Sequence, residues 1–198
     1  APIEHLDFVQ IEYWEDLKTI FDWTQTNVHS TFAVCWGAMA MLHYFYKLPK
    51  YQLTKKAFGC YHHKNIAPEN KYLRGFSDKI EIPVSRWSEM RQVDIEKHES
   101  LRILLTSEKV GPCLIEDKKL QALYMFNHLE YDTSTLANEY SRDKEHKASA
   151  SKPVNYFPDN KSSNSPSNKW RSHGHLLYGN WINEIYQRTP FDFSKIGK

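Results

Sequence analysis

Cysteine is scarce in this chain of 198 residues, which contains only three, all far apart. An odd number of widely spaced cysteines makes neither a disulfide framework nor a zinc cluster. We therefore expect a reducing, cytoplasmic location, in which a free thiol survives. We expect neither a bound metal nor a bound cofactor.

Long apolar runs and an excess of one charge are also lacking. No apolar run reaches the roughly 18 residues that a membrane-spanning helix needs. The formal net charge is only +2, and basic residues are scattered among acidic ones, whereas a nucleic-acid-binding protein shows a clustered basic face. We expect neither a membrane nor a nucleic acid as a partner.

The chain has no initiator methionine and opens on Ala1-Pro2-Ile3-Glu4, as though cut within a loop. Its length supports one domain, and a parallel α/β sheet normally has earlier strands upstream of such a point. We expect residues 1–198 to form a single domain that lacks its N-terminal portion, including the first strands of the sheet.

Aromatic residues are abundant at 14% and can fill a substantial core. Hydrophobic periodicity and turn residues predict helices near residues 11–27, 36–46, 133–146 and 170–187. Strands are predicted at residues 31–34, 57–62, 79–84, 101–107, 113–117 and 121–126. Residues 51–70 otherwise look irregular, and residues 147–168 read as a long surface connection. The alternation predicts an α/β fold with a mostly parallel sheet.

A cysteine interrupts the segment STFAVCWGAMAMLHYFY, residues 30–46, between a predicted strand and a predicted helix. The free N–H groups and the dipole at a helix N-terminus lower the pKa of a thiol and favour the nucleophilic thiolate. Cys35 is therefore a candidate nucleophile. The alternative is a buried structural cysteine, which behaves as a small hydrophobe.

The second candidate group follows the predicted strand at residues 121–126, where His128 and Glu130 precede a helix. Histidine accepts and returns a proton near neutral pH, and a neighbouring carboxylate fixes its tautomer. Open α/β folds place their sites at this edge of the sheet. The alternative is a His-Glu pair that only closes a helix terminus.

Taken together, these motifs resemble the class I glutamine amidotransferase-like superfamily, and within it the MetA-type homoserine O-acyltransferases. FAVCWGAMA resembles the nucleophile elbow of that family, and FSDKIEIPVSR the segment that ends in its Ser-Arg pair. NHLEYDTSTLANEYSRD resembles "GHPEYD…TLA.EY.RD". VNYFP and KWRSHGHLLYGNWINEIYQRTPFD resemble its C-terminal signature. The resemblance covers essentially the whole chain and implies a flavodoxin-like sheet with helices on both faces.

The resemblance implies transfer of an acyl group from an acyl-CoA co-substrate through a cysteine thioester. Cys35 would be the nucleophile, His128 the general base, and Glu130 the group that orients it. The backbone N–H groups of Ile3 and Trp36 would form the oxyanion hole.

Further positions follow from the same resemblance. Lys56, Ser85 and Arg142 fall at substrate-contacting positions, with Arg86 beside them. Without the resemblance, Lys56 could be a solvated surface charge and Arg142 part of an ordinary ion pair. Glu4 falls where glutamate accompanies acetyl-CoA and glycine accompanies succinyl-CoA, which implies acetyl-CoA as the donor.

The acceptor is less determined, because the chain departs from the family pattern at Met39, Val84 and Asn127. We expect L-homoserine and methionine biosynthesis. L-serine, which leads to cysteine biosynthesis, is an alternative, since a pocket discriminates one methylene by only about 1–3 kcal/mol. Further alternatives are a homoserine O-succinyltransferase and, more remotely, a glutamine amidotransferase subunit. The resemblance also implies a homodimer.

Overall fold

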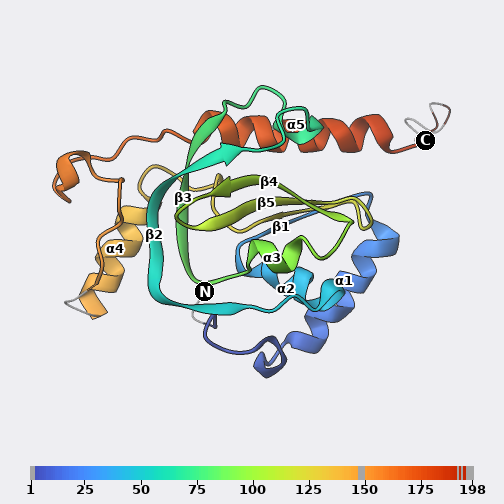
Figure 1. The fold of residues 1–198 in the computed structure, drawn as a ribbon, viewed down its shortest axis with the longest axis horizontal. Coiled ribbons are helices and arrows are strands. Elements are labelled where there is room, and N and C mark those ends of the chain that lie inside the picture. Colours follow the sequence, from blue (N-terminus) through green and yellow to red (C-terminus); the bar gives the residue numbers. More distant parts are fainter. Residues whose placement is uncertain (1–2, 147–149, 191, 193, 195–198) are drawn as a thin grey trace.

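The computed structural model describes residues 3–146, 150–190, 192 and 194. Figure 1 shows a strongly curled sheet with helices on two sides. The α-helices are α1 (Trp14–Asn27), α2 (Trp36–Tyr46), α3 (Gln92–Ile95), α4 (Thr135–His146) and α5 (Arg171–Arg188). The strands are β1 (Thr31–Val34), β2 (Tyr51–Asn65), β3 (Lys79–Glu89), β4 (Leu101–Ser107), β5 (Gly111–Asp117) and β6 (Ala122–Met125).

The strands of the described residues form one six-stranded sheet in the order β1-β6-β5-β4-β2-β3. The β1–β6 pair is parallel, and the β6–β5, β5–β4, β4–β2 and β2–β3 pairs are antiparallel. An α/β fold is confirmed, but the expectation of mostly parallel pairing is wrong for this part of the chain. Short connections join β4, β5 and β6, and such connections can link only antiparallel neighbours.

Strand β2 is much longer than the predicted segment at residues 57–62. It pairs with β3 from Tyr51 opposite Glu89 to Lys64 opposite Lys79, with an irregularity between Gln52 and Ala57. The polar run Thr54-Lys55-Lys56 hides the first half of this strand in the sequence. Cross-strand pairing with β3 extends both strands beyond what local propensity predicts.

Two hydrophobic cores lie on opposite faces of the sheet. Along β5 and β6, Leu114 and Leu123 belong to the core that includes Trp170 and Leu177 at α5. The alternate residues, such as Ile115 and Tyr124, belong to the core under α1 and α2. Figure 1 shows α5 on one side of the sheet and α1 and α2 on the other. Helices on both faces are thus confirmed.

Most of the other predicted elements lie close to their observed bounds. Helix α1 begins at Trp14, three residues later than predicted, and residues 8–10 before it form a separate 3-10 turn. The described part of the predicted surface connection, residues 150–168, contains only a short 3-10 turn and a bridge between Val154 and Gly59. Gly59 has φ 135°, and a Cβ there would lie 2.2 Å from the Val154 carbonyl oxygen. Within the described residues, no helix combines the length and apolar character needed to cross a membrane.

Candidate active site

Cys35 lies at a sharp turn between β1 and α2. Its backbone has φ 53° and ψ −123°, a conformation that residues with a side chain rarely adopt. Its N–H donates to the carbonyl oxygen of Met125 at 2.6 Å, which ties the turn to the end of β6. A strained strand-to-helix turn of this kind exposes a nucleophile above a sheet. The Cys35 side chain is partly exposed, whereas Cys60 and Cys113 are buried.

His128 follows the end of β6 and pairs with the carboxylate predicted from the sequence. Its Nδ1 lies 2.6 Å from Oε1 of Glu130, so Nδ1 carries the proton and donates it to the carboxylate. Its Nε2 is buried and makes no hydrogen bond to any of the described residues. Nε2 is therefore the ring nitrogen of His128 that is available for proton transfer.

The charge state of His128 depends on both neighbours. Burial of the ring lowers the pKa of His128, but the neighbouring Cys35 and Glu130 side chains together outweigh burial and raise the pKa to about 9. The imidazole is therefore protonated at neutral pH when Cys35 is a thiolate. A thiolate beside an imidazolium is the reactive form of a catalytic cysteine.

Tyr131 packs against a face of the His128 imidazole. Its ring is stacked on His128 with the centroids 4.1 Å apart and the planes 15° apart. Burial raises the pKa of Tyr131, so its phenol stays neutral. The stack and the Glu130 hydrogen bond together restrict the orientation of the His128 ring.

A cavity of about 1070 Å³ brings the predicted site residues together. Its lining includes Cys35, Trp36 and Gly37 at the start of α2, and His128 and Tyr131 after β6. The remaining lining residues come from β2, β3, α4 and the N-terminal turn: Glu4, Lys56, Ser85, Trp87, Thr135, Asn138, Glu139, Arg142 and Asp143, together with Val34. Cys35 and His128 therefore face one common space.

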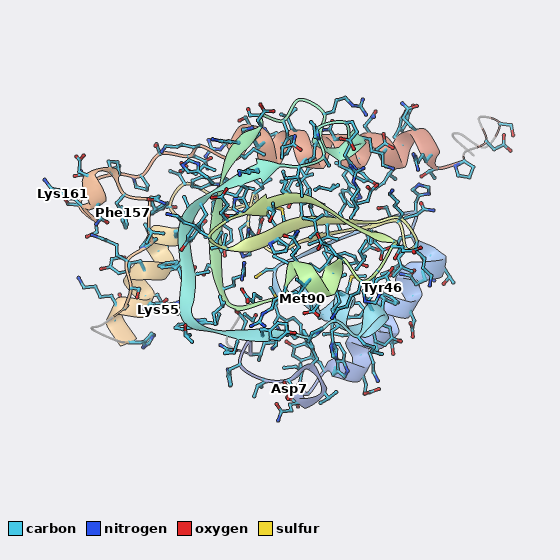
Figure 2. All side chains as sticks on the ribbon, viewed as in Figure 1. Asp7, Tyr46, Lys55, Met90, Phe157 and Lys161 are labelled. Atoms are coloured by element: carbon cyan, nitrogen blue, oxygen red, sulfur yellow. The ribbon has the colours of Figure 1, made fainter. Side chains whose placement is uncertain are left out.

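Lys56 lines this cavity. Its neighbour Lys55, on the part of β2 that passes α4, is exposed (Figure 2). The Lys56 ammonium lies 2.7 Å from Glu139 and 2.8 Å from Asp143. The side chain is only 11% exposed, which excludes the alternative of a solvated surface charge.

Glu139 is the centre of this charged cluster. Ser85 donates its hydroxyl to Glu139 at 2.7 Å, and Arg142 lies 3.8 Å from the same carboxylate and 3.2 Å from Asp143. Lys56, Ser85 and Arg142 are thus grouped around one carboxylate, and Arg142, 63% exposed, also forms the ion pair with Asp143 that was the alternative for it. Sequence reasoning missed Glu139, although it precedes Arg142 by three residues and shares its face of α4.

Glu4 lies in the cavity and is 3% exposed. Its carboxylate accepts hydrogen bonds from the Trp87 backbone N–H and, at 3.4 Å, from the Ser88 hydroxyl. Lys50 donates to the Glu4 carbonyl oxygen at 2.6 Å. These bonds fix a carboxylate in the cavity that Cys35 and His128 also line.

The two predicted oxyanion-hole residues differ in placement. Trp36 lines the cavity as the first residue of α2, so its N–H has no acceptor within the helix. Ile3 packs against the core under α2 and is not among the residues that line the cavity, although Glu4 beside it is.

Arg86 does not line the cavity, contrary to its expected place beside the substrate. It is 2% exposed, and its guanidinium donates to the carbonyl oxygens of Ser88 and Val110 and to Oδ1 of Asn127. The alternation of side chains along β3 turns Ser85 toward the cavity and Arg86 away from it.

Comparison with known proteins identifies the family. The family described as "Homoserine O-succinyltransferase" matches residues 1–191. Proteins named homoserine O-acetyltransferase from Roseobacter denitrificans and Cereibacter sphaeroides are 58% identical over all 198 residues. The chain spans 65% of the length of these relatives.

Solved structures share the fold at low sequence identity. A glutamine amidotransferase from Thermotoga maritima has a TM-score of 0.64 and 12% identity, covering 91% of this chain and 72% of its own. A glutamine amidotransferase from Methylobacillus flagellatus has a TM-score of 0.60 and 10% identity, with the same two shares covered, 91% and 72%. The fold is therefore glutamine amidotransferase-like, and the chain belongs to the homoserine O-succinyltransferase family.

Proposed function

We propose that the protein containing this chain transfers an acetyl group from acetyl-CoA to the hydroxyl of L-homoserine, a step of methionine biosynthesis in the cytoplasm. The observation that carries the proposal is the shared cavity of Cys35 and His128, in which Glu130 fixes the proton of Nδ1. The names of the relatives from Roseobacter and Cereibacter support the reaction class.

In the first half-reaction, the Cys35 thiolate attacks the thioester carbonyl of acetyl-CoA. A tetrahedral oxyanion forms, and the Trp36 N–H at the start of α2 is placed to donate to it. The carbon–sulfur bond to CoA then breaks, CoA leaves with the proton of His128 Nε2, and an acetyl-Cys35 thioester remains.

In the second half-reaction, His128 acts as a base. Acetylation removes the negative charge of Cys35, so the contributions of Cys35 that raise the pKa of His128 disappear, while burial still lowers that pKa. Neutral Nε2 accepts the proton of the acceptor hydroxyl as its oxygen attacks the thioester. Collapse of the second tetrahedral intermediate releases the ester and restores the thiolate and imidazolium.

The charged cluster suits an amino-acid acceptor. Arg142 can grip a carboxylate through two parallel hydrogen bonds, and the carboxylates of Glu139 and Asp143 suit an ammonium. Lys56 and Arg142 balance Glu139 and Asp143 in charge. A zwitterion therefore meets groups of both signs without leaving a net charge in the cluster.

The test is to incubate the complete protein with acetyl-CoA alone and map the adduct by peptide mass spectrometry. We expect one acetyl group on Cys35 and none on buried Cys60 or Cys113. The Cys35→Ala variant should carry no acetyl group and should show no transfer. Turnover of L-homoserine by a protein that never carries an acetyl group on Cys35 would exclude the two-step mechanism.

Adding an acceptor to the acetylated protein separates the alternatives. We expect L-homoserine to discharge the thioester faster than L-serine does. Faster discharge by L-serine would assign the protein to cysteine biosynthesis, and release of ammonia from L-glutamine without acetyl transfer would assign it to the glutamine amidotransferases.

A further inference from the structure

Asn127 is fully buried and immediately precedes His128 in the chain. Strand β6 ends at Met125, and the Phe126 N–H makes one more bond, to the Cys113 carbonyl oxygen at 2.7 Å. The backbone then leaves the β5 side of the sheet and meets β3, where the His128 N–H donates to the Pro83 carbonyl oxygen at 2.9 Å. Between these two backbone hydrogen bonds, the Asn127 side chain makes the hydrogen bonds that link this segment to β2 and β3.

The Asn127 carboxamide connects two neighbouring strands. Its Nδ2 lies 2.8 Å from Nε2 of His63 on β2, and its Oδ1 accepts from Nε of Arg86 on β3 at 3.4 Å. His63 is fully buried, and Arg86 is 2% exposed. Neither end of the carboxamide can exchange its partner for water.

The hydrogen-bond roles in this network are determined. His63 Nδ1 lies 2.9 Å from the Tyr61 carbonyl oxygen, which can only accept, so Nδ1 carries the proton. Burial lowers the pKa of His63 to about 4, so the ring is neutral and Nε2 is an acceptor. Nε2 therefore accepts from Asn127 Nδ2, which leaves Oδ1 to accept from Arg86.

We propose that His63, Asn127 and Arg86 form a positioning network that fixes the backbone before His128 and thereby aims its imidazole at Cys35. None of the three residues lines the cavity that contains Cys35 and His128, so they are positioning residues. The inference rests on the proposed roles of Cys35 and His128. It also gives Arg86 a function, since its guanidinium is anchored on the carbonyl oxygens of Ser88 and Val110.

The test replaces Asn127 by leucine, which keeps the approximate size of the side chain and adds no charge beside His128, but can neither donate to His63 nor accept from Arg86. Two readouts follow the Cys35–His128 pair: the rate of Cys35 alkylation by iodoacetamide at neutral pH, and the midpoint of His128 titration by NMR. We expect alkylation to slow about tenfold or more, because iodoacetamide reacts with the thiolate and a thiol without an imidazolium partner is only a few per cent thiolate at pH 7. The His128 midpoint should fall, because Cys35 raises it.

A pair of His63 variants tests the same contact from the other side. His63→Gln keeps an acceptor for Asn127 and should retain near-wild-type alkylation and titration. His63→Leu removes the acceptor and should behave as Asn127→Leu does.

Asn70 provides the matched control. It is also buried, and its side chain donates to Glu116 at 2.8 Å and accepts from the Tyr72 N–H at 3.0 Å. Asn70→Leu should lower the thermal unfolding temperature without changing either readout.

Wild-type alkylation and titration in both Asn127→Leu and His63→Leu would overturn the proposal and leave the network a purely structural role. Alkylation requires neither acetyl-CoA nor an acceptor. A failure of the proposed acyl transfer would therefore show as an absent acetyl-enzyme while these two readouts still respond.

Discussion

At the scale of single residues, the proposed preference for acetyl-CoA rests on Glu4, which lines the same cavity as Cys35. The carboxylate is buried and held by the N–H of Trp87. Acetyl-CoA has an uncharged acyl group, whereas the succinyl group ends in a carboxylate. Two like charges about 4 Å apart repel by roughly 4 kcal/mol at an effective dielectric constant of about 20, which is on the order of 1000-fold in rate.

Replacing Glu4 by glycine should therefore shift the donor preference toward succinyl-CoA, because both the charge and the volume of the side chain are removed. The measurement is the ratio of kcat/KM for succinyl-CoA to kcat/KM for acetyl-CoA. Glu4→Gln keeps the volume and removes only the charge, so its ratio should lie between those of the wild type and Glu4→Gly. A ratio that stays at the wild-type value in both variants would refute the role of Glu4.

The sequence predicts those site residues that sit in a local motif. Cys35 is recognisable between a strand and a helix, and His128 and Glu130 stand two residues apart after a strand. Glu139 has only its spacing of three residues from Arg142, and His63 has no local signal. Their other partners, Lys56 and Asn127, lie far away in the chain. Arg86 was predicted to lie beside the substrate but does not line the cavity. Its neighbour Ser85 reaches the cavity, while Arg86 points into the protein.

At the scale of elements, α5 supports the segment that carries His128. The Trp170 indole, just before α5, donates to the Tyr131 carbonyl oxygen at 2.7 Å. Within the helix, a Cβ on Gly174 would lie 2.7 Å from the carbonyl oxygen of Leu129. Glycine at this position lets the helix approach the backbone between His128 and Glu130.

We expect Gly174→Ala to lower the free energy of unfolding by roughly 1–3 kcal/mol, as overpacking does, and to reduce acetyl transfer because α5 presses on this segment. Gly179 lies in the same helix, and a Cβ there would meet no atom of the described residues within 4 Å. Gly179→Ala should instead stabilise the protein by up to about 1 kcal/mol through helix propensity. Chemical denaturation measures the change in the free energy of unfolding for both variants. Equal changes for the two substitutions would contradict the contact between Gly174 and Leu129.

Elements with a strong local pattern are predictable from the sequence, and elements formed by pairing are not. The apolar run Thr31–Val34 gives the bounds of β1, and the helical spacing after Cys35 gives α2. The first half of β2 contains Lys55 and Lys56 and becomes a strand only because β3 pairs with the ends of this region. Antiparallel pairing likewise arises from short turns rather than from the apolar pattern of each strand.

At the scale of the whole molecule, the site depends on long-range topology. The parallel pairing of β1 with β6 brings the Cys35 turn to the segment that carries His128. The β2–β3 pair and α4 complete the cavity with Lys56, Ser85 and Glu139. Only the resemblance to a family predicted that these distant segments form one site. Composition and periodicity contain no information on which distant segments meet.

The coupling between Cys35 and His128 is the central claim, and an NMR titration of the His128 ring tests it most directly. The resonance is assigned by its loss in His128→Gln. We expect a midpoint near pH 9 in the wild type, because Cys35 and Glu130 outweigh burial in raising the pKa. In Cys35→Ala the midpoint should fall well below that value, since burial then opposes Glu130 alone. The same midpoint in both proteins would contradict the account.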